Sequence, residues 1–242
     1  MSPVEPFTSL QWPTDIIDRD AKQALASVAA GRVVAALAAS TRPAPRVGLG
    51  SGSTSFLTLL ILAGARRELP SDVAFVATSY EMEWYATAAG FAVVDVGTGD
   101  VAVAFDGADQ VDPTGALVKG RGGAMHRERA VLAAADLELI VADASKRVPQ
   151  LGGCPLPLVL RPADIFACVE AVEGVGAGPV VLRAGTGKDG PVLTESGGVL
   201  ADLLVPGDVV VTDGLDRSIR AVPGVMDTGY FAPSAKRQFV EG

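Results

Sequence analysis

The sequence contains little cysteine, little histidine and few aromatic residues. Its two cysteines, Cys154 and Cys168, are too few for a disulfide framework or a cysteine-rich zinc site. The single histidine, His126, excludes sites that need several imidazole ligands. Aromatic residues make up only 5% of the chain, although 49% of its residues are hydrophobic. We therefore expect both cysteines to be packing residues, and we expect neither a metal nor another cofactor.

The chain also lacks an excess of basic residues. It has 28 acidic and 20 basic residues, which give a formal net charge of -8. Binding to a nucleic-acid backbone requires clustered lysine and arginine, so nucleic acid is not an expected partner. A small phosphorylated ligand remains compatible with an acidic protein, because it needs only a local group of backbone amides and a lysine.

A long hydrophobic segment is missing as well. The longest apolar run, residues 56–65, is well short of the roughly 20 residues that span a bilayer. Residues 1–15 are acidic and contain proline, without the basic and apolar regions of a signal peptide. We expect no membrane association and a cytoplasmic location.

The first part of the chain shows a regular alternation of apolar strands with helices. We expect strands at 46–50, 73–77, 91–96, 101–105 and 137–142. We expect helices at 18–39, 54–65, 80–89 and 124–135. Such alternation is typical of βαβ units and a parallel sheet. The predicted fold class is α/β, with a mostly parallel, Rossmann-like sheet flanked by helices.

The pattern changes after Gly152. Short strands between glycine turns are expected at 155–160, 179–182, 191–193 and 199–201, with one helix at 163–173. These elements indicate a smaller α+β domain inserted toward the C-terminus. The predicted organisation is an irregular N-terminal extension at 1–17, an α/β catalytic domain at 18–152, the α+β domain at 153–228 and a C-terminal tail at 229–242.

A glycine-rich turn, GLGSGST at 48–54, lies at a strand-to-helix junction. Glycines let the backbone approach an anion, and the N-terminus of the following helix attracts negative charge. Position 53 is serine, where a dinucleotide fingerprint needs glycine and a P-loop needs lysine. We predict that Ser51, Gly52, Ser53 and Thr54 bind a small phosphate; a purely structural turn and a nucleotide-binding loop are the alternatives.

Two carboxylates, Asp106 and Asp109, follow the apolar strand expected at 101–105. The carboxyl end of a strand in an open α/β sheet is where ligands bind. A metal site is disfavoured, because no other aspartate, glutamate or histidine has convincing ligand spacing. We predict a catalytic role for both residues, with capping of the turn as the alternative.

A second glycine-rich turn follows Lys119 at residues 120–123. A cation beside an amide-rich loop can stabilise an oxyanion on a substrate. Glu128, on the helix that follows, is a candidate general base, and a surface residue that complements the helix dipole is the alternative. We interpret His126 as a residue of the pocket wall or the surface. Lys146, after the next strand, either reaches the same edge or is solvated.

In this order, four motifs resemble type A ribose-5-phosphate isomerase. They are GLGSGST at 48–54, DGAD at 106–109, KGRGGAMHRE at 119–128 and VADASK at 141–146. Weaker similarity continues through PLPLVL at 155–160 and VPGVMDTGYF at 222–231. The resemblance covers most of the chain, and the combination is far more specific than any single motif.

The resemblance implies an isomerase that interconverts ribose 5-phosphate and ribulose 5-phosphate through a cis-enediolate, without a metal. It implies that Glu128 moves the proton between C1 and C2, that Asp106 and Asp109 assist ring opening and hydroxyl proton transfer, and that Lys119 stabilises the enediolate. The family also implies a homodimer or a higher homo-oligomer. The implied substrate-binding residues are Lys22, Ser51, Gly52, Ser53, Thr54, Thr78, Ser79, Gly120, Arg121, Gly122, Gly123 and Lys146.

The chain departs from the family pattern at several positions. Gln110 replaces a usual glutamate, Arg121 a usual glycine, and His126 a small hydroxyl or apolar residue. The segment at 33–46 looks longer than usual, and the last family strand, after residues 230–231, is expected to be missing. A divergent paralogue acting on another sugar phosphate and a non-catalytic sugar-phosphate sensor are therefore alternatives. A CoA-transferase-like enzyme fits the length and the motifs poorly.

Overall fold

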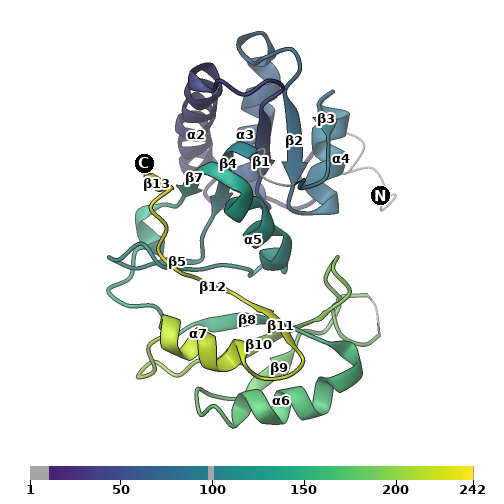
Figure 1. Ribbon diagram of the computed structural model, residues 1–242, viewed down its shortest axis with the longest axis vertical. Helices are drawn as coiled ribbons and strands as arrows, with labels where there is room; N and C mark the ends of the chain where they lie inside the picture. Colours follow the sequence, from purple (N-terminus) through teal and green to yellow (C-terminus); the bar gives the residue numbers. More distant parts are fainter. Residues whose placement is uncertain (1–10, 98–100, 188, 242) are drawn as a thin grey trace. The chain divides into compact units, whose positions relative to one another are not determined.

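The computed structural model describes residues 11–97, 101–187 and 189–241 (Figure 1). Two compact units interleave along the chain. Unit 1 contains the described parts of Met1–Gly107, Arg127–Ser145 and Ala235–Gly242, and unit 2 contains those of Ala108–His126 and Lys146–Ser234. The continuous domain ranges expected from the sequence remain predictions.

Unit 1 is built on a six-stranded sheet with the order β13-β7-β4-β1-β2-β3. Every neighbouring pair in this sheet is parallel. The mostly parallel α/β sheet predicted from the alternating pattern is therefore confirmed. Its strands are β1 (Arg46–Leu49), β2 (Ala74–Ala77), β3 (Ala92–Val93), β4 (Val101–Gly107), β7 (Ala135–Val141) and β13 (Arg237–Val240).

Helices cover both faces of this sheet. The helices are α2 (Arg19–Ala39), α3 (Ser53–Gly64), α4 (Tyr80–Ala88) and α5 (Met125–Ala134), with a 3-10 turn η1 (Arg66–Glu68). The core under α2, α3 and α4 includes Val47 and Leu49 of β1. Gly48, between them, points to the opposite face, where a Cβ would lie 2.5 Å from Val131 of α5. In the described part of the chain, no helix has the length and apolar character needed to cross a membrane.

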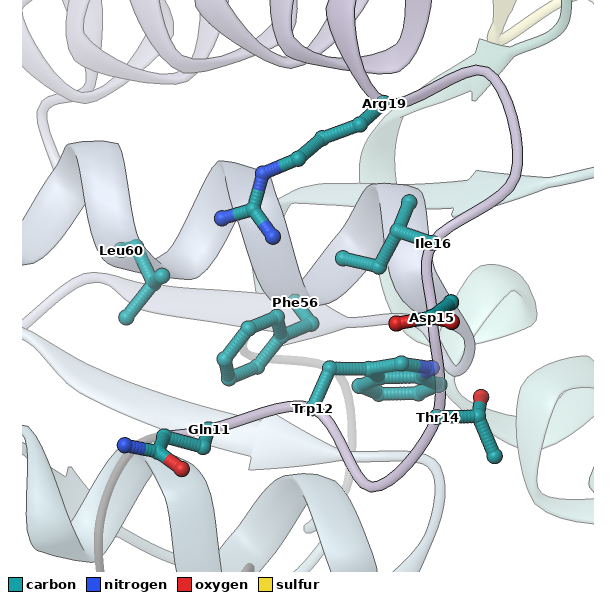
Figure 2. Close-up of a pocket in the computed structure, with 8 residues that line it drawn as sticks. All are labelled: Gln11, Trp12, Thr14, Asp15, Ile16, Arg19, Phe56 and Leu60. Atoms are coloured by element: carbon teal, nitrogen blue, oxygen red, sulfur yellow. The ribbon is translucent and has the colours of Figure 1, made fainter.

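The described N-terminal segment packs on α3 without forming a helix or strand before Arg19. The Trp12 and Phe56 rings lie 5.3 Å apart, and the Tyr85 hydroxyl donates a 2.7 Å hydrogen bond to the Gln11 carbonyl. A pocket of about 280 Å³ lies beside this segment. Figure 2 shows the residues that line it, none of which is a predicted site residue. Its lining consists of Gln11, Trp12, Thr14, Asp15, Ile16, Arg19, Phe56 and Leu60.

Unit 2 combines antiparallel sheets with two helices, as the predicted α+β character requires. One sheet has the order β11-β8-β10-β9 and the other the order β12-β6-β5. The four-stranded sheet places Leu156, Leu158 and Leu160 in a separate core. The elements are β5 (Gln110–Val111), β6 (Leu117–Val118), β8 (Pro155–Leu160), β9 (Val180–Leu182), β10 (Val199–Leu204), β11 (Val225–Thr228), β12 (Tyr230–Phe231), α6 (Ile165–Glu173), α7 (Asp213–Arg220) and η3 (Pro162–Asp164). The 3-10 turn η2 (Ala144–Lys146) begins in the sequence of unit 1 and ends in that of unit 2.

Two expectations for the later part of the chain were wrong. Residues 191–193 form no strand but only isolated bridges to Ala184 and Val199, and Pro191 has no N–H to donate to a sheet. The closing strand, expected to be missing, is present as β13, which pairs in parallel with β7. Because β13 has only four residues, its pattern is too short to predict a strand, and pairing with β7 stabilises it.

Candidate functional site

The carboxyl ends of β1 and β4 meet at the point where the strand order of the unit 1 sheet reverses. Ligands of open α/β sheets bind at this switch point. The Gly50 N–H donates a 2.9 Å hydrogen bond to the Phe105 carbonyl. A Cβ on Gly50 would lie 2.4 Å from the carboxyl group of Asp106, so glycine is required for this carboxylate to lie against the β1 loop. Asp106 is buried, and its Oδ1 accepts a 2.8 Å hydrogen bond from the Gly107 N–H.

The predicted phosphate-binding hydroxyls lie at the same edge of the sheet. Ser51 Oγ and Thr78 Oγ1 are 2.8 Å apart. Because the Thr78 hydroxyl donates its proton to the Leu49 carbonyl, Ser51 is the donor to Thr78. The structure therefore brings together two hydroxyls that are 27 positions apart in the sequence.

The first turn of α3 presents backbone amides at this edge. Ser53 and Thr54 begin the helix, whose first residues carry no negative charge that would compete with an anion. Ser79, by contrast, caps α4, because its hydroxyl accepts from the Met82 N–H at 3.3 Å. Lys22 lies near the start of α2 and is partly buried. The start of α3 thus has the free amides and the lack of negative charge that an anion site needs, and Ser79 caps α4.

Glu128 is a buried residue of α5, with 5% of its surface exposed. This burial contradicts the alternative interpretation of Glu128 as a surface residue. The preceding Arg127 lies over the ring of Tyr80, with its guanidinium carbon 5.1 Å from the ring centroid. Together with Val131, which faces Gly48, this contact holds the helix that carries the carboxylate.

In unit 2, Asp109 is joined to the second glycine-rich turn. Its Oδ2 accepts a 3.0 Å hydrogen bond from the backbone N–H of Arg121. The Gly123 N–H donates to the Gly120 carbonyl at 2.9 Å, and Gly120 has a φ of 98° that favours glycine. Two of the four amides predicted to face the substrate thus donate within the protein.

Lys119 is buried at the end of β6, with 2% of its surface exposed. Its backbone N–H donates to the Gly229 carbonyl at 2.9 Å, and its Nζ lies 5.7 Å from the centroid of the Phe231 ring. Neither Gly229 nor Phe231 was among the residues predicted from the sequence. The only sequence feature that includes them is the motif at 222–231. The pairing of β12 with β6 brings this motif beside Lys119.

Gln110 and His126, which depart from the family pattern, each contact another residue of unit 2. The Gln110 side chain donates to the Gly152 carbonyl at 2.9 Å and accepts from its N–H at 3.0 Å. An ionised glutamate cannot make the first of these bonds. His126 Nδ1 lies 3.1 Å from Oδ2 of Asp227. Lys146 ends the turn η2 and is partly buried.

The predicted site residues fall into two groups, one in each unit. Unit 1 holds Lys22, Ser51, Gly52, Ser53, Thr54, Thr78, Ser79, Asp106 and Glu128. Unit 2 holds Asp109, Lys119, Gly120, Arg121, Gly122, Gly123 and Lys146. Among the described residues, no cluster of three or more histidine, cysteine, aspartate or glutamate side chains could hold a metal ion. The functional groups that the predicted site residues provide are buried carboxylates, a buried lysine and backbone amides.

Comparison with known proteins gives a consistent family. The model of the family "Ribose 5-phosphate isomerase A (phosphoriboisomerase A)" matches residues 74–242. The ribose-5-phosphate isomerase A of Halobacterium salinarum is 39% identical over 206 residues, which cover 85% of this chain and 88% of the relative. That of Methanothermobacter thermautotrophicus is 37% identical over 186 residues, covering 77% and 81%.

Solved structures agree with the sequence matches. The ribose 5-phosphate isomerase A of Methanocaldococcus jannaschii has a TM-score of 0.80 at 30% identity, covering 93% of this chain and 96% of that one. A D-ribose-5-phosphate isomerase in complex with phospho-erythronic acid has a TM-score of 0.79 at 29% identity, with the same coverage. The resemblance stated from the four motifs is thereby confirmed. The chain belongs to the ribose 5-phosphate isomerase A family of enzymes.

Proposed function

We propose that this protein interconverts ribose 5-phosphate and ribulose 5-phosphate through a cis-enediolate, with Glu128 as the general base. The observation that carries the proposal is the burial of Glu128 on α5 in a chain of this family. A carboxylate buried away from water, on a helix that Arg127 and Val131 hold against unit 1, suits proton transfer to and from carbon. No cofactor takes part in the proposed reaction.

In the proposed reaction, Glu128 takes the proton from C2 of the open-chain aldose. The electron pair of the C–H bond forms the C1–C2 double bond, and the C1 carbonyl oxygen takes the negative charge. The hydroxyl proton on O2 then passes to O1, and Glu128 returns its proton to C1. The product is the ketose, and the carboxylate is regenerated.

Asp106 and Asp109 are proposed to assist ring opening and the transfer of the hydroxyl proton. The proposed role of Asp106 is supported by its position at the switch point of the sheet, where the absence of a side chain on Gly50 leaves room for the carboxylate. Asp109 uses Oδ2 to hold the Arg121 amide. Its other carboxylate oxygen, Oδ1, lies 3.9 Å from Nε of the exposed Arg121 side chain, which we propose contacts the sugar.

Lys119 and the glycine-rich turn are proposed to stabilise the enediolate oxygen. A buried ammonium group and fixed amides stabilise developing charge more strongly than water-exposed groups do. Because the amides of Arg121 and Gly123 donate within the protein, the contribution of this turn falls to Gly120 and Gly122. Lys146 is proposed to contact the sugar.

The phosphate is proposed to bind at the N-terminus of α3. Free amides and the helix dipole favour an anion there, and Ser51 and Thr78 add hydroxyls at the same edge. Gly52, Ser53 and Thr54 supply the turn, and Lys22 and Ser79 are the remaining proposed ligands. A homodimer or higher homo-oligomer working in the cytoplasm is part of the proposal, and light scattering of the purified protein tests the oligomeric state.

The test uses EDTA-treated protein with ribose 5-phosphate, and measures the formation of ribulose 5-phosphate. We expect turnover in the wild type and a fall in kcat of about 10³-fold or more for Glu128→Gln, with KM changed only a few-fold. Glu170→Gln, on the exposed face of α6, is the matched control and is expected to keep full activity.

Three results would count against the proposal. An inactive wild type that still binds sugar phosphates would favour the sensor. Turnover of a different sugar phosphate alone would favour the divergent paralogue, and Arg121→Gly would then be assayed on both substrates. Full activity of Glu128→Gln would exclude Glu128 as the base.

A further inference from the structure

The backbone of the second glycine-rich turn is held from two sides within unit 2. Asp109 accepts from the Arg121 N–H at 3.0 Å. On the other side, Nη1 of Arg183 donates to the Arg121 carbonyl at 2.5 Å and approaches the Gly120 carbonyl at 3.4 Å. The turn is therefore tied to a residue more than 60 positions away, which none of the sequence motifs contains.

Arg183 is itself fixed by Asp202. Its Nε and Nη2 donate to the two carboxylate oxygens of Asp202, each at 2.6 Å. Asp202 lies on β10, between β8 and β9, and Arg183 follows β9 directly. The backbone of Arg183 continues the antiparallel pairing, since its N–H donates to the Leu200 carbonyl at 3.0 Å. A bidentate pair on an ordered sheet leaves the guanidinium little freedom to turn.

This contact has a consequence for the neighbouring amide. A peptide unit is planar and trans, so its carbonyl and its N–H point in opposite directions. The Arg121 carbonyl and the Gly122 N–H belong to one peptide unit. When Arg183 holds that carbonyl, the Gly122 N–H is aimed away from Arg183. The Arg121 and Gly123 amides are occupied, so Gly122 is one of the two amides of the turn left for a ligand.

We propose that Arg183, held by Asp202, is a positioning residue that aims the Gly122 amide at the enediolate oxygen. The inference rests on the proposed function, in which this turn stabilises the intermediate. Asp202 neutralises the charge of Arg183, so the pair acts through the orientation of the backbone and not as a free cation. The Arg183–Asp202 pair helps to stabilise charge that develops only during the reaction, so its removal is expected to lower kcat more than it raises KM.

The experiment compares Arg183→Met, Arg183→Lys and Asp202→Asn with the wild type on ribose 5-phosphate. Loss of one well-aimed donor to an oxyanion costs about 10²- to 10³-fold, and a misaimed donor costs less. We expect Arg183→Met to lower kcat by about 10- to 100-fold, with KM within about threefold. Arg183→Lys is expected to lose part of this activity: its ammonium group can still donate to one of the two partners, but it cannot hold Asp202 and the Arg121 carbonyl in the same geometry.

Two further measurements separate positioning from folding. Inhibition by phospho-erythronic acid, whose carboxylate resembles the enediolate, is expected to weaken in parallel with kcat. The double variant Arg183→Met/Asp202→Asn is expected to be no slower than Arg183→Met, because Asp202 acts only through Arg183. Arg217→Met is the matched control: Arg217 pairs with Asp213 on α7, is exposed, and is expected to leave kcat unchanged.

The outcomes are distinguishable. Unchanged kcat in Arg183→Met beside an active wild type would overturn the inference alone. The inference would also be overturned if kcat of Arg183→Met returned to the wild-type value at a temperature at which urea unfolding shows the variant to be fully folded. A loss of kcat/KM caused entirely by a higher KM would overturn it as well. An inactive wild type would overturn the proposed function, and this inference with it.

Discussion

His126 Nδ1 lies 3.1 Å from Oδ2 of Asp227, whose side chain is 2% exposed. The other oxygen of Asp227 accepts from Nη2 of Arg220 and from the Thr228 N–H, each at 2.7 Å. Arg220 also pairs with Asp216 at 2.8 Å. Within unit 2, one buried carboxylate thus joins β11, α7 and His126. The histidine that departs from the family pattern is part of this network.

Replacing Asp227 is expected to destabilise the protein. Asp227→Ala leaves Arg220 and the Thr228 amide without their shared acceptor, and breaking a largely buried pair typically costs about 3 kcal/mol. Because the Arg220 side chain is 31% exposed, we expect a loss of about 2 kcal/mol in the free energy of unfolding, measured by urea titration. Asp213→Ala, which removes an exposed pair on the same helix, is expected to cost about 1 kcal/mol or less. Equal losses in both variants would contradict the prediction.

A negative charge at the start of α3 is expected to weaken phosphate binding. Ser53→Glu places a carboxylate where the proposed phosphate lies, and the two anions repel each other. We expect KM for ribose 5-phosphate to rise at least about tenfold, with a smaller change in kcat, because the phosphate is remote from the reacting carbons. Ser71→Glu, on an exposed turn of the same unit, is the control. An unchanged KM in Ser53→Glu would place the phosphate elsewhere.

Tyr85 is expected to make stability fall at high pH. Burial, with a smaller contribution from the charge of Glu81, raises the pKa of the Tyr85 hydroxyl from 10.0 to about 12. Below pH 10 the residue is neutral in the folded and the unfolded chain. Between pH 10 and 12 the unfolded chain ionises first, so stability decreases as the pH rises, by up to about 2 to 3 kcal/mol.

The measurement for Tyr85 is urea unfolding of the wild type and of Tyr85→Phe from pH 9 to 11.5. The variant loses the hydrogen bond to Gln11, which costs about 1 kcal/mol at pH 9. Its stability is expected to fall less steeply above pH 10 than that of the wild type. Parallel curves for the two proteins would refute the assignment to Tyr85.

Cys154 is expected to report on the charge of Asp109. Burial, and then the nearby carboxylate of Asp109, raise the pKa of the Cys154 thiol. Since the thiolate is the reactive form, Asp109→Asn is expected to speed alkylation of Cys154 by iodoacetamide at pH 8 several-fold. Cys154→Ser identifies the labelled site by mass spectrometry, and Cys168, which is buried, is expected to react slowly in every variant. An unchanged alkylation rate would show that the two side chains do not interact.

Several features followed from the sequence because their cause is local. The alternation of apolar runs with helices specified a parallel sheet, since strands buried on both faces need apolar side chains along their length. The glycines before α3 and after Lys119 marked turns that few other residues can form. Asp106 and Glu128 were proposed as site residues from motifs whose members are adjacent in the chain.

Other features depend on residues that meet only in the folded chain. The tie between Arg183 and Arg121, the contact of Lys119 with Phe231 and the pairing of Gln110 with Gly152 each join distant positions. The strand β13 is stabilised by its partner β7 and not by its own four residues. A sequence pattern records the preference of each segment, but hydrogen bonds between segments depend on strand order and register. The sequence therefore predicted most of the helices and strands and the proposed catalytic groups, and the tertiary structure decided which backbone atoms hold them in place.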